Sequence, residues 1–272
     1  NAAGASNHKR KTVAGKISLN LGGGAARGIA HIGAIRALVE NDIRIGQLIG
    51  ISMGAICGAV YAVMPEVDFL EKRIMQLIDF EPFKNSVVGS WTSSHEENPR
   101  NIVRRAQKIF TSTNILRRIF TATGVLTAAE VYGVLHPFLA DIAMHSTEIP
   151  FATAAVNIRS GELRVFAGAD RLRQAVVASA SMPLIFPPER IGTESYVDGG
   201  VLDKLGIDTA ARIGAERVVV IDVSDERLPD TMPKSGFDVI LKTEEIASEH
   251  RRTMQLERAA LVVRPIRGNY HW

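Results

Sequence analysis

Gln47-Leu-Ile-Gly-Ile-Ser-Met-Gly-Ala-Ile-Cys-Gly58 places a serine between two glycines, directly after a short apolar run. The spacing Gly50, Ser52, Gly54 is typical of a nucleophile elbow, in which a strand delivers a serine onto a sharp turn and a helix follows at once. The two glycines leave room where strand, turn and helix approach one another. The stretch therefore predicts a strand up to Gly50, a strained turn at Ser52 and a helix from Met53 to about Met64.

Two other interpretations of this stretch stay open. Gly46 to Pro65 contains no charged residue, and glycine recurs at every fourth position from Gly50 to Gly58, as in a glycine-faced transmembrane helix. Alternatively, the stretch is a buried helix in which Ser52 is only the N-cap. The proline at its end and the α/β character of the remaining chain favour the elbow over the membrane helix.

The composition indicates one large domain without a nucleic-acid surface. With 272 residues and 46% hydrophobic content, the chain can bury a single core. A net charge of +3, a pI of about 9.1 and 6% aromatic residues are too mild to indicate nucleic-acid binding. The single cysteine, Cys57, excludes an internal disulfide and a multi-cysteine metal site. We expect a protein of the cytoplasm or of the membrane periphery, although an export signal removed ahead of Asn1 stays open, as does the oligomeric state.

A second glycine-rich turn follows the first predicted strand. Lys16 to Leu21 alternates with a period of two and leads into Gly22-Gly-Gly-Ala-Ala-Arg-Gly28, after which Ile29 to Glu40 has helical spacing. Successive N–H groups in such a turn can converge on an anion. The turn does not match a nucleotide motif, because Ile29 stands where a P-loop needs Lys and Arg27 where the dinucleotide pattern needs Gly.

The two turns are expected to lie side by side. If the strands that precede them are parallel neighbours, their turns meet at one edge of the sheet, which is where an oxyanion hole lies relative to its nucleophile. His31 lies in the helix after the first turn and faces no evident acid, so we interpret it as a structural residue.

The segment 68–123 is predicted to be helical with irregular breaks. Within it, two amphipathic stretches over 100–118 carry arginines and lysines beside an apolar face. Such helices could rest on an anionic membrane surface, or they could present an ordinary solvated face.

The second half of the chain has an alternating α/β order. Thr127-Ala-Ala-Glu130 is a capping box that opens a helix to about Ala140, and Arg159-Ser-Gly161 joins two strand-like runs as a hairpin. Helices are expected at 172–180, from 207 and over 238–260, with strands at 217–223 and 261–263. In between, Asp198-Gly-Gly200 holds a carboxylate on a tight turn at the end of a short strand.

A serine nucleophile needs a base, and Asp198 fits that role better than any histidine. His250 stands on a charged helical face, and His271 is next to the last residue. A conventional hydrolase triad also places its serine after several strands, whereas one predicted strand precedes the strand of Ser52. A Ser–Asp dyad requires Asp198 within hydrogen-bond reach of Ser52, in a site dry enough to raise the basicity of the carboxylate.

Four motifs, in order, resemble those of the patatin-like phospholipase family. They are the two glycine-rich turns, Ala178-Ser-Ala-Ser-Met-Pro-Leu-Ile-Phe-Pro-Pro188 and Asp198-Gly-Gly200. The resemblance implies a three-layer α/β/α fold with a central, mostly parallel sheet. We expect one domain over 16–265, in which 68–123, a segment without a matching family motif, is a helical insertion or lid. It implies lipid acyl esters as substrates, without metal or cofactor. The implied site comprises nucleophile Ser52, base Asp198, elbow glycines Gly50 and Gly54, acid-loop glycines Gly199 and Gly200, and an oxyanion hole of Gly22, Gly23, Gly24 and Arg27.

Two positions depart from the family pattern. After Asp-Gly-Gly the family usually continues with Asn and then Pro, where this chain has Asp203 and Gly206. These changes fall in the loop beside the base, so we expect them to affect the efficiency of the reaction rather than its type. We expect a serine lipid acyl hydrolase, and a lipid- or anion-binding protein that kept the fold but lost turnover stays open as the alternative.

Overall fold

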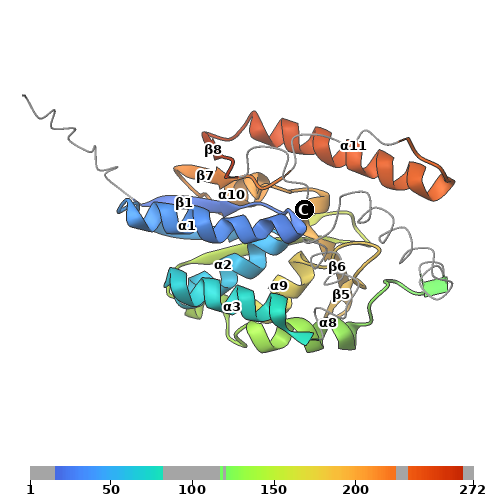
Figure 1. Cartoon of the computed structure of the whole chain (residues 1–272), viewed down its shortest axis with the longest axis horizontal. Coiled ribbons are helices and arrows are strands. Elements are labelled where there is room, and N and C mark those ends of the chain that lie inside the picture. The colour runs from blue at the N-terminus through green and yellow to red at the C-terminus, as the bar shows by residue number, and fades with distance from the viewer. Residues whose placement is uncertain (1–15, 82–116, 119–120, 225–231, 266–272) are drawn as a thin grey trace, which may run out of the picture.

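In a computed structural model of the chain, which describes residues 16–81, 117–118, 121–224 and 232–265, one sheet forms the centre of the fold (Figure 1). The strand order is β5-β6-β3-β2-β1-β7-β8, and β4 also pairs with β3. The strands are β1 (Ile17–Leu21), β2 (Ile45–Gly50), β3 (Phe151–Asn157), β4 (Leu163–Phe166), β5 (Glu189–Ile191), β6 (Glu194–Asp198), β7 (Val218–Ile221) and β8 (Leu261–Val263).

Most strand pairs in the middle of this sheet are parallel. β1 runs parallel to β2 and β7, β2 to β3, and β7 to β8. β3 pairs antiparallel with β4, its hairpin partner, and with β6. Parallel neighbours need crossover connections, and helices supply them here, as between β1 and β2. The predicted mostly parallel sheet and the hairpin are confirmed.

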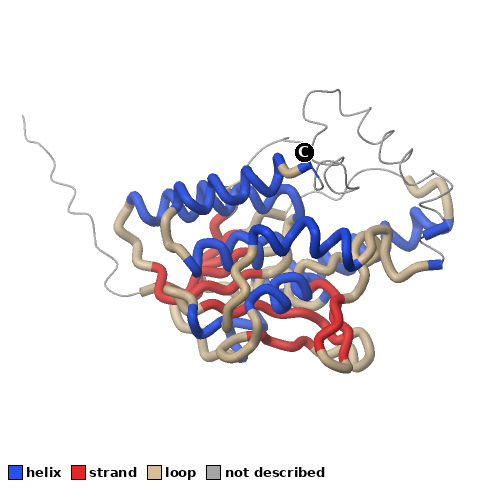
Figure 2. Tube along the Cα trace, turned by 90° about the horizontal axis from the view of Figure 1, so that it is seen from below, coloured by secondary structure: helices blue, strands red, loops and turns tan. Residues whose placement is uncertain are grey.

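Helices cover both faces of the sheet (Figure 2). The α-helices are α1 (Ala30–Glu40), α2 (Met53–Val63), α3 (Val67–Asp79), α8 (Ala128–Leu135), α9 (Leu172–Ser179), α10 (Ile207–Arg212) and α11 (Gly236–Leu256). Short 3-10 helices are η1 (Ala25–Ile29), η3 (His136–Phe138), η4 (Met144–Ser146) and η5 (Gly199–Val201).

The alternation within β1 shows why there are three layers. Leu19 and Leu21 point into the main core with α1, α2, α3, α8 and α9. Asn20 points to the other face, where its amide donates to the backbone oxygens of Leu205, at 3.2 Å, and Gly206, at 2.8 Å. α11 lies across the sheet from α2 and α3 (Figure 1). The predicted three-layer α/β/α architecture is confirmed.

The transmembrane interpretation of Gly46 to Pro65 is wrong. These residues divide between the end of β2 and α2, with the turn at Ser52 between them. Across the described ranges, no helix combines the length and the apolar character that crossing a bilayer requires.

The segment predicted to be an insertion or lid starts inside the core. α3 buries Leu70, Ile74 and Leu77 in the main hydrophobic cluster, so this helix belongs to the body of the fold. The basic stretch 100–118 lies outside the described residues except for 117–118.

α8 begins as predicted and ends earlier. The Thr127 hydroxyl accepts a hydrogen bond from the Glu130 N–H, and the Glu130 carboxylate accepts from the Thr127 N–H, which completes the capping box. The helix stops at Leu135 rather than Ala140, because Pro137 has no N–H to continue the hydrogen-bond pattern.

A buried ion pair anchors α11 to the sheet. Arg252, 3% exposed, binds the fully buried carboxylate of Asp222 at 2.7 Å, just after β7. Arg252→Met leaves the buried Asp222 carboxylate to Arg264, whose side chain is 37% exposed and whose Nε lies 3.4 Å away, so we expect the free energy of unfolding to fall by about 3 kcal/mol. Thermal and urea unfolding measure the loss.

The matched control for this prediction is the neighbouring residue. Arg251 pairs at 2.6 Å with Glu244, whose side chain is 62% exposed. A pair of that kind contributes about 0–1 kcal/mol, so Arg251→Met should leave stability nearly unchanged. Equal effects of the two substitutions would contradict the anchoring role of Arg252.

Candidate functional site

Ser52 stands on the strained turn that the sequence predicts. Its backbone has φ 56° and ψ −122°, in the positive-φ region that non-glycine residues rarely adopt. A β-carbon on Gly50 would lie 2.3 Å from the Gly54 oxygen, and one on Gly54 would lie 2.0 Å from the Leu21 oxygen. Ser52 is the N-cap residue of α2, but its side chain makes no capping hydrogen bond. Capping alone therefore does not account for the serine.

Strand β3 brings Asp198 to this turn. Thr153 of β3 pairs with Gly50 at the end of β2, and Ala155 pairs with Asp198 at the end of β6. Because β4 occupies the other edge of β3, β2 and β6 share one edge and approach each other from opposite directions. Two residues of a strand span about 6.6 Å, so the end of β6 arrives next to the end of β2.

The Asp198 carboxyl is buried and more basic than usual. Burial raises the pKa of Asp198 to about 6, against hydrogen bonds from the Ser52 side chain and the Gly200 N–H and against the charge of Lys204, all of which lower it. The Gly200 N–H donates to Asp198 Oδ1 at 2.7 Å. A β-carbon on Gly199 would lie 2.2 Å from the Ala154 oxygen, which explains the first glycine of this turn. At neutral pH the carboxyl is mostly ionised yet close to its pKa, as a general base requires.

The segment after α9 holds the two turns together. Ser179 Oγ accepts a hydrogen bond from the Ser52 N–H at 3.1 Å. Two residues later, the Ser181 oxygen accepts from the Asp198 N–H at 2.9 Å. The sequence singled out the motif that contains both serines but assigned neither a role, and nothing in the local pattern indicates these partners.

The glycine-rich turn lies beside Ser52, as predicted, but two of its N–H groups are engaged within the fold. The Gly22 N–H donates to the Ile221 oxygen at 3.1 Å, and the Gly23 N–H donates to the Lys204 oxygen at 2.8 Å. For these two residues, the expected role as donors to an oxyanion is therefore not met in this structure. A β-carbon on Gly23 would lie 3.4 Å from Ser52 Cβ, so the turn nevertheless touches the serine.

Other N–H groups at this turn are available. Within the described part of the chain, the N–H groups of Gly24, Ala25 and Met53 donate to no hydrogen-bond acceptor. The Arg27 N–H donates to the Gly24 oxygen at 3.1 Å, closing the first turn of η1. Ala25 and Met53 also line the same pocket as Ser52.

His31 has a structural role beneath the glycine-rich turn. Its Nε2 lies 2.8 Å from the Gly22 oxygen, and the ring is fully buried. Burial lowers the pKa of His31 to about 4, so the neutral ring donates from Nε2. His250 lies on α11, exposed, and His271 is outside the described residues. The interpretation of His31 as a structural residue agrees with this geometry.

Asp203 and Gly206, which depart from the family pattern, both lie in the loop after Asp198 and have defined roles there. The Asp203 carboxylate, fully buried, accepts from the Thr209 N–H at 2.7 Å and its hydroxyl at 2.6 Å. Gln255 of α11 donates to Asp203 Oδ1 at 2.8 Å. Gly206 adopts φ +69°, which glycine allows without strain and proline cannot adopt. Asp203 and Gly206 therefore support an ordered loop.

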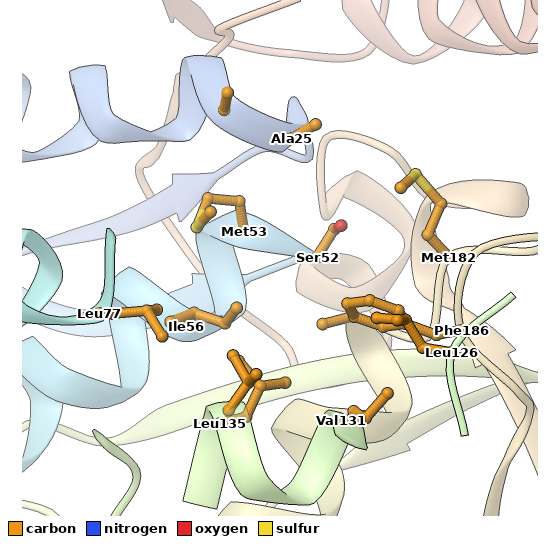
Figure 3. A pocket seen from close by; sticks show the side chains of 13 residues that line it. Ala25, Ser52, Met53, Ile56, Leu77, Leu126, Val131, Leu135, Met182 and Phe186 are labelled. Carbon is orange, nitrogen blue, oxygen red and sulfur yellow. The ribbon is translucent and has the colours of Figure 1, made fainter. Parts of the chain in front are cut away.

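An apolar pocket opens at Ser52 (Figure 3). It has an empty volume of about 720 Å³, including the space at its mouth, and Ser52 supplies the one polar side chain in its described lining. Leu77 and Leu135 lie away from the serine, while Phe186 and Leu126 lie on the other wall (Figure 3). In the same described residues, no group of three His, Cys, Asp or Glu side chains gathers as a metal site would require. The pocket suits a hydrocarbon chain attached to a group that reacts at Ser52.

Comparison with known sequences places the chain in a family. The family model for patatin-like phospholipases matches residues 19–211, well over half of the chain. An uncharacterized NTE family protein of Mycobacterium tuberculosis is 26% identical over 209 residues, which are 77% of this chain and 49% of that protein. A lysophospholipase, NTE1, of Mycosarcoma maydis is 27% identical over 238 residues, which are 85% of this chain and 11% of that protein. The chain thus spans about half or less of the length of these relatives.

VipD from Legionella pneumophila aligns over 89% of this chain and 55% of its own, with a TM-score of 0.43 and 18% identity.

Proposed function

Because the chain belongs to the patatin-like phospholipase family, we propose that it hydrolyses acyl esters of lipids through an acyl-enzyme on Ser52. The observation that carries the proposal is the position of Ser52, which stands on a strained turn, next to a buried basic carboxylate, at the mouth of an apolar pocket. Together, these three features provide a nucleophile, a base and a place for the acyl chain.

In the first half-reaction, Ser52 Oγ attacks the ester carbonyl carbon and Asp198 accepts the hydroxyl proton. The tetrahedral intermediate then expels the alcohol, which takes that proton from Asp198. In the second half-reaction, water attacks the acyl carbon, Asp198 accepts a proton from the water, and Ser52 leaves with this proton as the acid is released. Asp198 thus acts in both halves and ends unchanged.

The oxyanion of each intermediate would be held by backbone donors from two turns. We assign this role to the N–H groups of Gly24 and Ala25, together with that of Met53, which follows the nucleophile. Gly22, Gly23 and Arg27 then support the turn: their N–H groups bond inside the fold, and His31 holds the Gly22 oxygen.

Substitution of Gly24 tests this assignment. A methyl group there would lie 2.5 Å from Val223 Cγ2, so Gly24→Ala must displace the turn. We expect kcat to fall by about 10²–10³-fold, as when one oxyanion donor is lost, while Ser52 still reacts slowly with a fluorophosphonate. Adding Val223→Ala makes room for the methyl group and should restore much of kcat. If the turn has only a structural purpose, Gly24→Ala lowers the Tm and leaves kcat per folded molecule unchanged.

The function itself is tested with purified protein, a fluorophosphonate probe and a panel of lysophospholipids and p-nitrophenyl esters. We expect labelling of Ser52 and release of fatty acid from the lipids. The alternative, a lipid-binding protein without turnover, would bind lipid vesicles but neither react with the probe nor release acid.

A further inference from the structure

A second pocket follows the first along α2. Ile56 lines the first pocket, and Val60 and Val63, further along the same face of the helix, line the second. A second boundary between the pockets lies at the end of α8, where Leu135 lines the first pocket and His136 the second. The second pocket has an empty volume of about 790 Å³, including its open side. The two pockets share no lining residue among those described, so the second pocket is separate from the mouth at Ser52.

All charged side chains in the described lining of this second pocket are basic. Arg73 of α3 donates from Nη2 to the Pro137 oxygen at 2.6 Å, and its guanidinium lies 5.2 Å from the centre of the Phe138 ring. Arg173 of α9 donates from Nε and Nη2 to the Leu139 oxygen, at 3.1 and 2.9 Å. A guanidinium has five N–H donors, so these carbonyls use only part of what the two arginines offer.

The positive charge around the pocket is only partly balanced. Asp141 pairs with Arg171 at 2.6 Å and lies 3.6 Å from Arg173, so its charge is divided between the two. His136 adds a ring without charge at neutral pH, because burial and the nearby Arg173 lower its pKa. The surplus of positive charge on Arg73 and Arg173 suits a headgroup with a single negative charge. The rest of the described lining is apolar and includes Val60 and Val63 of α2 and Phe69 of α3.

We propose that this second pocket binds a long-chain carboxylate, with its headgroup between Arg73 and Arg173 and its chain against Val60, Val63 and Phe69. Guanidinium groups bind carboxylates in a fork geometry that an ammonium group does not offer. The proposal does not depend on chemistry at Ser52, although a fatty acid is also the kind of product that the proposed reaction would release.

Calorimetry with laurate, below the concentration at which it forms micelles, tests the proposal on the full chain. Arg73→Gln and Arg173→Gln keep an amide that can donate to the Pro137 or Leu139 oxygen but remove the charge. Each is expected to weaken laurate binding by about tenfold or more. Arg251→Gln is the control, since this arginine pairs with Glu244 on α11 and does not line the pocket, and it should change the affinity by less than about twofold.

A bulky substitution in the first pocket distinguishes binding there from binding in the second pocket. Val131 lines the first pocket and not the second, so Val131→Trp should leave laurate binding intact. If Val131→Trp abolishes binding while Arg73→Gln and Arg173→Gln retain it, laurate sits beside Ser52 and the proposal is wrong. Dodecanol, which has the same chain without charge, should bind at least tenfold more weakly than laurate. Tighter binding of dodecyl phosphate than of laurate would overturn the carboxylate assignment in favour of a phosphate headgroup.

Discussion

Ser52→Ala is expected to reduce ester hydrolysis by about 10⁴-fold or more while leaving the fold intact. Loss of the attacking atom removes the acyl-enzyme route altogether, whereas the residual rate from substrate binding and oxyanion donors stays small. The hydroxyl is partly accessible and makes no capping bond to α2, so its loss should cost little stability. Steady-state rates on a p-nitrophenyl ester and a lysophospholipid, with Tm on the same preparation, measure both effects.

The control for this substitution is Ser52→Gly. Glycine adopts φ 56° without strain, so this variant should be as inactive as Ser52→Ala and at least as stable. A Ser52→Ala variant that kept more than about a tenth of the wild-type rate would show that the nucleophile is another residue.

Asp198→Asn is expected to abolish activity and, at alkaline pH, to stabilise the protein. The amide keeps an oxygen for the Gly200 N–H but cannot accept the Ser52 proton, so we expect kcat to fall by roughly 10⁴-fold. In the wild-type protein, kcat/KM should rise with pH through about 6, as the carboxyl loses its proton. Rates measured from pH 4.5 to 8.5 test this profile.

The stability effect follows from the raised pKa of Asp198. The pKa of Asp198 rises from an ordinary value of 3.8 to about 6 in the folded state, so the protonated carboxyl favours folding more than the ionised one does. The contribution of this group to the free energy of unfolding is fully present below about pH 3.8 and is lost as the pH rises through about 6. The shift corresponds to at most about 3 kcal/mol. Asp198→Asn, which cannot ionise, should melt several degrees above wild type at pH 8 and at nearly the same temperature at pH 4.

Two results would contradict this account of Asp198. Activity that survives in a folded Asp198→Asn variant would place the base elsewhere. A Tm below wild type at both pH values would mean that the hydrogen bonds of the carboxylate outweigh its burial. Arg252→Met does not touch Asp198 and serves as a reference for destabilisation that is not linked to this carboxyl.

Local features of this protein were predictable from the sequence because their causes are local. The glycine spacing around Ser52 predicted the elbow, since a β-carbon at Gly50 or Gly54 would collide with residues only a few positions away or with the adjoining strand. The capping box at Thr127 predicted the start of α8 for the same reason. The end of α8 was missed because the helical periodicity was extended across Pro137, which lacks the N–H that a helix interior needs.

The family motifs also indicated Asp198 as the partner of Ser52, but spacing along the chain could not show how they meet. Their meeting depends on β3, which pairs with β2 and β6 on one edge so that the two strand ends face each other. The distribution of N–H donors is likewise a tertiary property. Gly22 and Gly23 look like free donors in the sequence, but their N–H groups donate to the oxygens of Ile221, at the end of the neighbouring strand β7, and of Lys204, both of which are distant in the chain.

Glycine conformation, capping and periodicity act within a few residues, so the sequence predicts the turns that present Ser52 and Asp198, the proposed nucleophile and base. Long-range packing sets which carboxylate is dry, which N–H groups remain available and where the apolar and basic pockets lie. Burial, pKa and hydrogen-bond partners depend on long-range strand pairing and on helices packed from distant parts of the chain, such as α3 and α8, which line the pocket that opens at Ser52.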